Sequence, residues 1–139
     1  MRRLRALPAA TLLLAACSSP RESTPVPEGP VKVVAVDVGR SIGADKRVSA
    51  PADTFSPADR IYVSVVTEGT ADEVALGARW LRAEERLEET VQRIAPEGTA
   101  VSEFHVLNPS GWTPGPYRVE ILLDGHVVAD RTFRVEASS

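Results

Sequence analysis

Short runs of alternating apolar and polar residues fill the chain from Val31 onwards, and turn-forming residues separate them. A period of two is typical of β-strands that bury one face. In the run from Val74 to Leu81, for example, alternate residues are large and apolar, and Val74, Leu76, Ala78 and Trp80 are expected to face inward. We predict about seven strands, over residues 31–38, 48–55, 61–68, 73–82, 87–94, 100–107 and, as a hairpin pair, 116–136.

The strongest local signal is Asp124-Gly125, which lies between two alternating runs. A two-residue type I′ turn needs positive φ at both central positions, and Asp-Gly is well suited to it. The sequence therefore predicts a β-hairpin here. The apolar residues at even spacing on its two strands are Tyr117, Val119, Ile121 and Leu123, then Val127, Ala129, Phe133 and Val135.

The segment from Ala83 to Ile94 has two interpretations. The spacing of Leu87, Val91 and Ile94 fits an amphipathic helix, and the Glu, Arg and Gln content favours one. The spacing of about 8–12 residues between neighbouring strands favours a further strand instead. We adopt the strand, within an all-β fold.

This layout resembles the immunoglobulin-like sandwich, an all-β fold of about seven antiparallel strands. Trp80 lies in a central predicted strand, and Tyr117 lies near the start of a late one, as in many such domains. The pattern from Gly115 to Gly125, closing on Phe133-Arg134-Val135, also resembles immunoglobulin-like modules of bacterial lipoproteins and surface proteins. The resemblance implies a domain over 31–137, and a fold alone implies no function.

The N-terminus has the features of a secretory signal. Three arginines precede an apolar run from Ala6 to Ala16, which is much shorter than the ~20 residues that span a bilayer. The sequence Leu14-Ala15-Ala16-Cys17 resembles the lipobox of bacterial lipoproteins. The resemblance implies a signal peptide over 1–16, cleavage between Ala16 and Cys17, and acyl chains on the Cys17 thiol and amino group.

The segment after Cys17 is expected to be a disordered tether over 17–30. Ser18 to Pro30 holds four prolines and a single aliphatic residue, so it is too polar to fold and is biased toward an extended form of at most about 40 Å. Two or more acyl chains anchor a protein stably. We therefore expect an extracytoplasmic protein anchored in the cell envelope. By analogy with enteric lipoproteins, Ser18 favours the outer membrane.

Charge excludes some partners. Removal of the signal takes three of the 16 basic residues and none of the 19 acidic ones, so the formal net charge changes from −3 to −6. Such a surface repels nucleic acid and anionic headgroups, and no nucleic-acid partner is expected. Cys17 is the one cysteine, which excludes an internal disulfide.

Candidate catalytic and metal-binding residues are few, and no catalytic residue, metal or cofactor is predicted. A metal site needs three or four convergent ligands, and the sequence offers only His105 and His126, interpreted as a solvent-facing strand residue and a turn neighbour. Ser41 has the Gly-x-Ser-x-Gly spacing of a hydrolase, within Gly39-Arg40-Ser41-Ile42-Gly43, but the segment lacks the helix start that gives this motif its meaning. The serines in or beside strands and the paired acids are interpreted as structural and solvated groups: Ser49, Ser64, Ser102, Glu84-Glu85 and Glu88-Glu89.

Two segments are candidate binding elements. Trp112, in the loop from Asn108 to Gly115, is either an exposed contact for a partner or glycan or a lid on the open end of the sandwich. The polar segment from Arg40 to Asp59 is either a binding loop or a loosely paired edge. The leading hypothesis is a non-catalytic module that contacts an envelope protein or polysaccharide. The alternatives are a small extracytoplasmic enzyme or enzyme inhibitor, and a solute or metal carrier.

Overall fold

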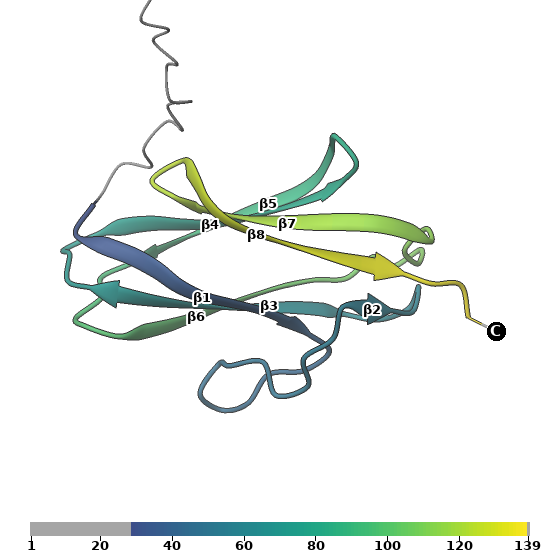
Figure 1. The fold of residues 1–139 in the computed structure, drawn as a ribbon, viewed down its shortest axis with the longest axis horizontal. Helices are drawn as coiled ribbons and strands as arrows, with labels where there is room; N and C mark the ends of the chain where they lie inside the picture. Colours follow the sequence, from purple (N-terminus) through teal and green to yellow (C-terminus); the bar gives the residue numbers. More distant parts are fainter. Residues whose placement is uncertain (1–28, 139) are drawn as a thin grey trace, which may run out of the picture.

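The computed structural model describes residues 29–138, which form two β-sheets packed face to face (Figure 1). The strand orders are β1-β3-β6 and β2-β8-β7-β4-β5. Neighbouring strands are antiparallel except the short parallel pair β2–β8. The strands are β1 (Val31–Gly39), β2 (Thr54–Phe55), β3 (Ile61–Gly69), β4 (Val74–Arg82), β5 (Glu85–Ile94), β6 (Ala100–Val106), β7 (Gly115–Leu123) and β8 (His126–Val135). The all-β prediction is confirmed.

The hydrophobic core lies between the two sheets. The four residues of β4 predicted to face inward are at most 5% exposed, which confirms that pattern. Trp80 is 1% exposed and meets the Phe133 ring edge-on at 6.1 Å, while Tyr117 stacks on Phe133 at 5.5 Å. Burying each large apolar side chain stabilises the fold by about 1.5–3 kcal/mol.

The predicted hairpin joins β7 to β8. Asp124 has φ of 48° and Gly125 φ of 84°, the two positive values that a type I′ turn requires. A β-bulge follows the turn: Leu122 pairs with Val127, but Ile121 pairs with Ala129. The bulge turns Val127 outward, where it is 42% exposed, so Val127 does not share the buried face of Phe133 and Val135 that their even spacing indicated.

The segment with two interpretations forms a strand. β5 pairs with β4 along its whole length, and Ala83, with φ of 52°, lies at the connecting turn. Because β4 would otherwise be a sheet edge with unpaired backbone groups, the pairing satisfies donors and acceptors that a helix over the same residues would leave open.

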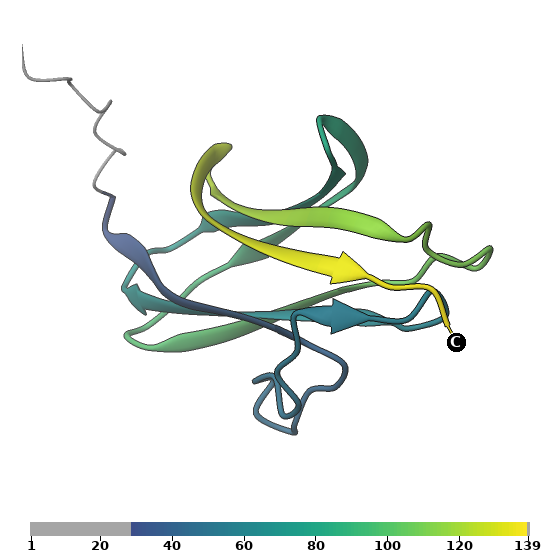
Figure 2. The same cartoon turned by 45° about the vertical axis from the view of Figure 1, so that its right-hand side comes forward.

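The strand predicted over 48–55 is wrong except at Thr54–Phe55. Residues 40–50 instead form a small hairpin-like excursion on the β1 side of the sandwich (Figures 1 and 2). Backbone hydrogen bonds within the excursion join its two arms, because the Ser49 N–H donates to the Ser41 carbonyl at 3.0 Å and the Gly43 N–H to the Arg47 carbonyl at 2.8 Å. The segment returns so close to β1 that a Cβ on Gly39 would lie 2.3 Å from the Ala50 carbonyl oxygen.

Candidate functional site

The residues predicted to carry the lipid anchor, Leu14 to Cys17, lie outside the described residues, as does the tether up to residue 28. The described chain begins with Gly29 and Pro30, and β1 starts at Val31. In the part of the chain that the structure covers, no helix is long and apolar enough to cross a membrane.

Trp112 belongs to the core, which agrees with its interpretation as a lid on the open end of the sandwich and corrects its interpretation as an exposed partner contact. The residue is 5% exposed, and its indole N–H donates to the Asp59 carbonyl at 2.9 Å. Its ring packs edge-on against Tyr117 at 5.7 Å. The apolar surface of Trp112 is therefore buried, and its one polar group is hydrogen-bonded within the domain. Trp112 closes the end of the sandwich between the β6–β7 loop and the Pro57–Asp59 turn.

The structure does not gather the candidate catalytic groups. His105 and His126 are both exposed and lie on β6 and β8, which belong to different sheets. Ser64 is 1% exposed, and its hydroxyl accepts a hydrogen bond from the Val48 N–H at 3.2 Å. Ser102 is buried as well, and the Ser49 hydroxyl bonds to the hydroxyl of Ser41. Within residues 29–138, no three His, Cys, Asp or Glu side chains are grouped as metal ligands would be.

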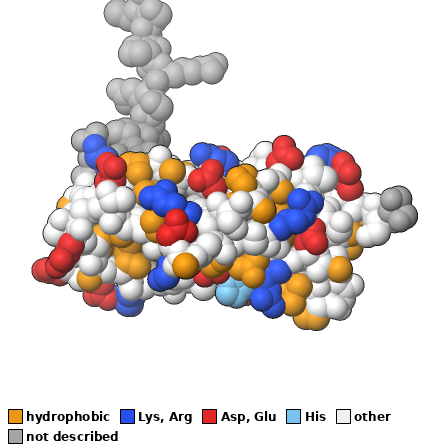
Figure 3. All heavy atoms as spheres, turned by 90° about the horizontal axis from the view of Figure 1, so that it is seen from below, with side chains coloured by type: hydrophobic (Ala, Val, Ile, Leu, Met, Phe, Trp, Pro, Cys, Tyr) orange, Lys and Arg blue, Asp and Glu red, His pale blue; other side chains and the backbone are white. Residues whose placement is uncertain are grey.

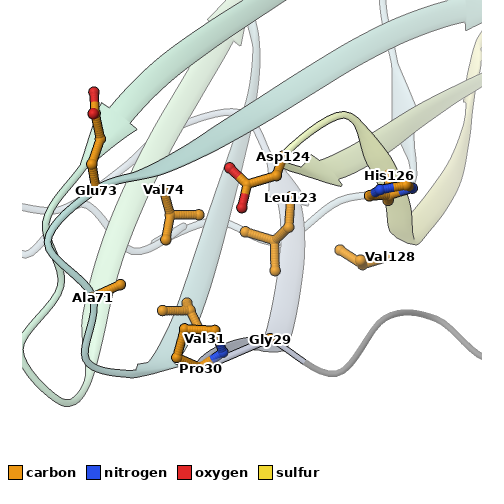
Figure 4. Close-up of a pocket in the computed structure, with 10 residues that line it drawn as sticks. All are labelled: Gly29, Pro30, Val31, Ala71, Glu73, Val74, Leu123, Asp124, His126 and Val128. Carbon is orange, nitrogen blue, oxygen red and sulfur yellow. The ribbon is translucent and has the colours of Figure 1, made fainter.

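A recess of about 180 Å³ lies where the described chain enters the domain (Figure 4). Its walls include Pro30, Val74 and Leu123. The acidic groups on its rim are already engaged. The Asp124 carboxylate accepts the Ala75 N–H at 3.0 Å, and Glu73 pairs with Arg93 at 2.8 Å. The recess is therefore a mostly apolar hollow beside the hairpin turn.

A row of alternating charges crosses the outer face of the five-stranded sheet. Arg79 of β4 is directly paired in register with Glu120 of β7 and Glu89 of β5, and its guanidinium lies 3.5 Å and 3.4 Å from their carboxylates. Arg86 joins Glu89 at 3.1 Å, and Arg118 joins Glu120 at 3.7 Å. The Arg79 side chain is only 20% exposed, so this network is less screened by water than ordinary surface pairs.

An apolar row runs beside the charged row. Val127, Leu122, Gly77 and Val91 are neighbours in register across β8, β7, β4 and β5. Leu122 is 3% exposed, whereas Val91, at the end of the row, is 57% exposed. The row therefore ends in an uncovered apolar side chain on the outermost strand.

β5 has a long free strand edge among the described residues. β2 pairs with β8 only at Arg134 and Val135, so it covers the end of that edge. A bulge at Val34 interrupts the edge of β1, and the Arg131 guanidinium donates to the Val36 carbonyl there at 3.1 Å. The Gln92 amide donates to the Glu103 carbonyl on the edge of β6 at 2.7 Å. Within residues 29–138, β4 is the one strand that pairs with β5.

The sequence indicates that β5 is an edge strand, because residues 85–94 have polar side chains on both faces of the strand. Nearly all of them are exposed in the structure. Charged side chains on an edge strand normally discourage unwanted pairing.

On the side of the molecule opposite the five-stranded sheet, charges of both signs are interspersed among apolar side chains, with no region of a single sign (Figure 3).

Comparisons with known proteins support the fold. No protein-family model matches the chain, and no curated protein matches it. An immunoglobulin-like protein from Pseudomonas aeruginosa is similar in structure, with a TM-score of 0.57 and 14% identity over 80% of this chain and 100% of that one. An alkylpurine DNA glycosylase from Pseudomonas fluorescens, solved with abasic-site DNA, has a TM-score of 0.52 and 16% identity over 78% of this chain.

These similarities show an immunoglobulin-like fold. The matched region makes up 31% of the glycosylase chain, so the similarity concerns one part of that larger protein. At such identities the likeness extends to the fold, and a fold hosts many unrelated functions.

Replacing Arg79 with methionine is expected to lower the free energy of unfolding by about 1–2 kcal/mol, because it leaves Glu89 and Glu120 facing each other without the cation between them. The matched control is Arg93→Met, which breaks a pair whose side chains are 74% and 56% exposed and should change stability by less than about 0.5 kcal/mol. Urea denaturation at low protein concentration measures both. Equal losses would show that the Arg79 network contributes no more than an ordinary surface pair.

Proposed function

We propose that this chain is a lipid-anchored extracytoplasmic lipoprotein whose immunoglobulin-like domain is a non-catalytic module of the cell envelope. The supporting observation is where the fold begins. β1 starts at Val31, directly after the predicted lipid site and proline-rich spacer, and the strands described run from there to Val135. An anchor and a spacer upstream would therefore take no strand from the sandwich.

The position of the chain entry supports this arrangement. Pro30 borders the recess beside the β7–β8 turn, at one end of the sandwich. The C-terminus and the loop closed by Trp112 lie at the other end (Figure 1). A domain tethered through residue 29 would direct this second end away from the membrane. The spacer, about 40 Å at full extension, would let the whole domain reach past the headgroups.

The contacts of the candidate catalytic residues support a binding role over chemistry. The Ser64 hydroxyl accepts a backbone N–H in a buried position, and Glu89 is held by Arg79 and Arg86. Groups already engaged in structural bonds are poorly placed to act as nucleophile or general base. The partner proposed is an envelope protein or polysaccharide. The expected net charge of −6 opposes binding to nucleic acid.

Mass spectrometry of the native protein tests the anchor. The expected result is an N-terminal Cys17 that carries covalent acyl chains, with residues 1–16 removed. An unprocessed Met1 terminus, or a free thiol on Cys17, would refute the lipoprotein proposal.

A pull-down tests the binding role. The form beginning at Ser18 keeps every described strand, so it can be immobilised without lipid and exposed to envelope extract. We expect one partner to be retained that an unrelated immunoglobulin-like domain does not retain. Recovery of the same material on both resins would contradict a specific binding function.

A further inference from the structure

From Glu88 to Ile94, β5 is regular and has one free side. Its register with β4 shifts only between Trp80 and Leu81, so the bulge falls at Leu87 and leaves the rest of the strand evenly paired. Every second backbone N–H and C=O in this stretch points away from β4, as in any edge strand. The stretch is long enough to accept another strand.

The symmetry of a closed dimer restricts how a second copy can use this edge. Two identical strands that pair antiparallel are related by a two-fold axis perpendicular to the sheet. Directly opposed residues then point to the same face. The axis must therefore pass midway between one residue of β5 and the same residue of the second copy, and each choice of this residue defines one register.

The charges on the outer face distinguish these registers. An axis at Glu89 would oppose that carboxylate to its own copy, and an axis at Thr90 would set Glu89 against Val91. An axis at Val91 instead opposes Val91 to itself and sets Glu89 against Arg93, twice by symmetry. On the inner face, the same register opposes Thr90 to Gln92, so no like charges meet there.

We propose that two copies of this protein associate through antiparallel pairing of β5 with β5, about a two-fold axis at Val91. The two five-stranded sheets then form one continuous sheet. The partner in this proposal is a second copy of the chain. The association does not depend on the lipid, although anchoring both copies in one membrane would raise their local concentration.

Both rows on the outer face continue across the proposed junction. The charged row Glu120–Arg79–Glu89 extends to the partner's Arg93, so the signs keep alternating. The apolar row from Leu122 through Gly77 to Val91 meets its own symmetry copy, and the 57% exposed Val91 becomes covered. Cross-strand pairs of opposite charge and of β-branched residues both stabilise a sheet.

A charge exchange tests the register in the form that begins at Ser18. Glu89→Arg and Arg93→Glu each place like charges opposite each other twice, and each should weaken self-association at least about tenfold. An equimolar mixture of the two variants restores opposite charges at both positions and should recover the dimer. The control is Arg47→Glu, an exposed charge on the excursion that should leave association unchanged. Sedimentation velocity measures the dimer fraction, and circular dichroism verifies folding.

A cysteine scan tests the axis independently, because the form that begins at Ser18 has no other cysteine. Opposed residues of an antiparallel pair have Cα atoms about 4.5–5.5 Å apart, a separation that a disulfide spans. Val91→Cys should therefore form a covalent dimer on mild oxidation. Val127→Cys, exposed on the same face but away from the edge, should not.

Three outcomes would overturn the proposal. The first is a protein that stays monomeric up to millimolar concentration. The second is a dimer unaffected by Arg93→Glu. The third is equal crosslinking through residues 91 and 127.

Discussion

Trp80→Ala is expected to lower the free energy of unfolding by about 3–5 kcal/mol, a large part of the stability of a domain this size. The indole is 1% exposed at the centre of the core, and Phe133 packs against it edge-on at 6.1 Å. The neighbouring strands are held by sheet hydrogen bonds and cannot close fully over the cavity. Thermal and urea unfolding measure the loss, which should lower the melting temperature by at least about 15 °C.

Two further variants show whether the loss comes from the buried aromatic ring of Trp80. Trp80→Phe keeps an aromatic ring and removes an indole N–H that has no hydrogen-bond partner, so it should cost much less than Trp80→Ala. Val127→Ala shortens an apolar side chain that is 42% exposed and should change stability by less than about 0.5 kcal/mol. A loss for Trp80→Ala no larger than that of Val127→Ala would contradict the central role assigned to this indole.

Removal of the lipid on Cys17 is expected to release the protein from the membrane. When the chain is exported behind a conventional cleavable signal peptide, Cys17→Ser is expected to move the protein from the membrane pellet to the soluble extracytoplasmic fraction. Two acyl chains bind a bilayer stably. Without the acyl chains, the expected net charge of −6 would repel the protein from anionic lipids. The ratio of pelleted to soluble protein should fall at least about 100-fold. Fractionation and immunoblotting measure it.

Ser18→Ala behind the native signal is the matched control, since it alters the neighbouring residue and keeps the thiol. This variant should remain in the membrane and keep its acyl chains. A Cys17→Ser protein that still pellets with membranes, and is released by salt, would show attachment through the folded domain instead of a lipid.

Residues 40–55 depart most from the secondary structure that their sequence predicts. The apolar residues there are few, and the prediction of a strand over 48–55 relied on the spacing of its neighbours. In the structure, the Val48 N–H donates to the Ser64 hydroxyl, and only Thr54–Phe55 is strand, pairing with the end of β8. A parallel contact with a strand some eighty residues later leaves no local pattern in the sequence.

The edge strand shows a similar limit. The spacing of Leu87 and Val91 is compatible with a helix and with a strand. The segment forms a strand because it pairs with β4, whose edge would otherwise be unpaired. The sequence displayed the polar character of both faces of β5. The opposition of Arg79 to Glu89 and Glu120 depends on strand order, which pairs β4 with β7 across a long sequence separation.

Local patterns in the sequence predict the all-β class, the inward residues of β4 and the hairpin at Asp124-Gly125, because alternation and turn chemistry are local properties of the chain. Contacts between distant segments set the bulge that exposes Val127, the burial of Trp112 against the Asp59 carbonyl, and the free edge of β5. Each of these depends on which distant segments share a surface. Only the packed sandwich determines that, since burial and strand pairing are set by neighbours in space.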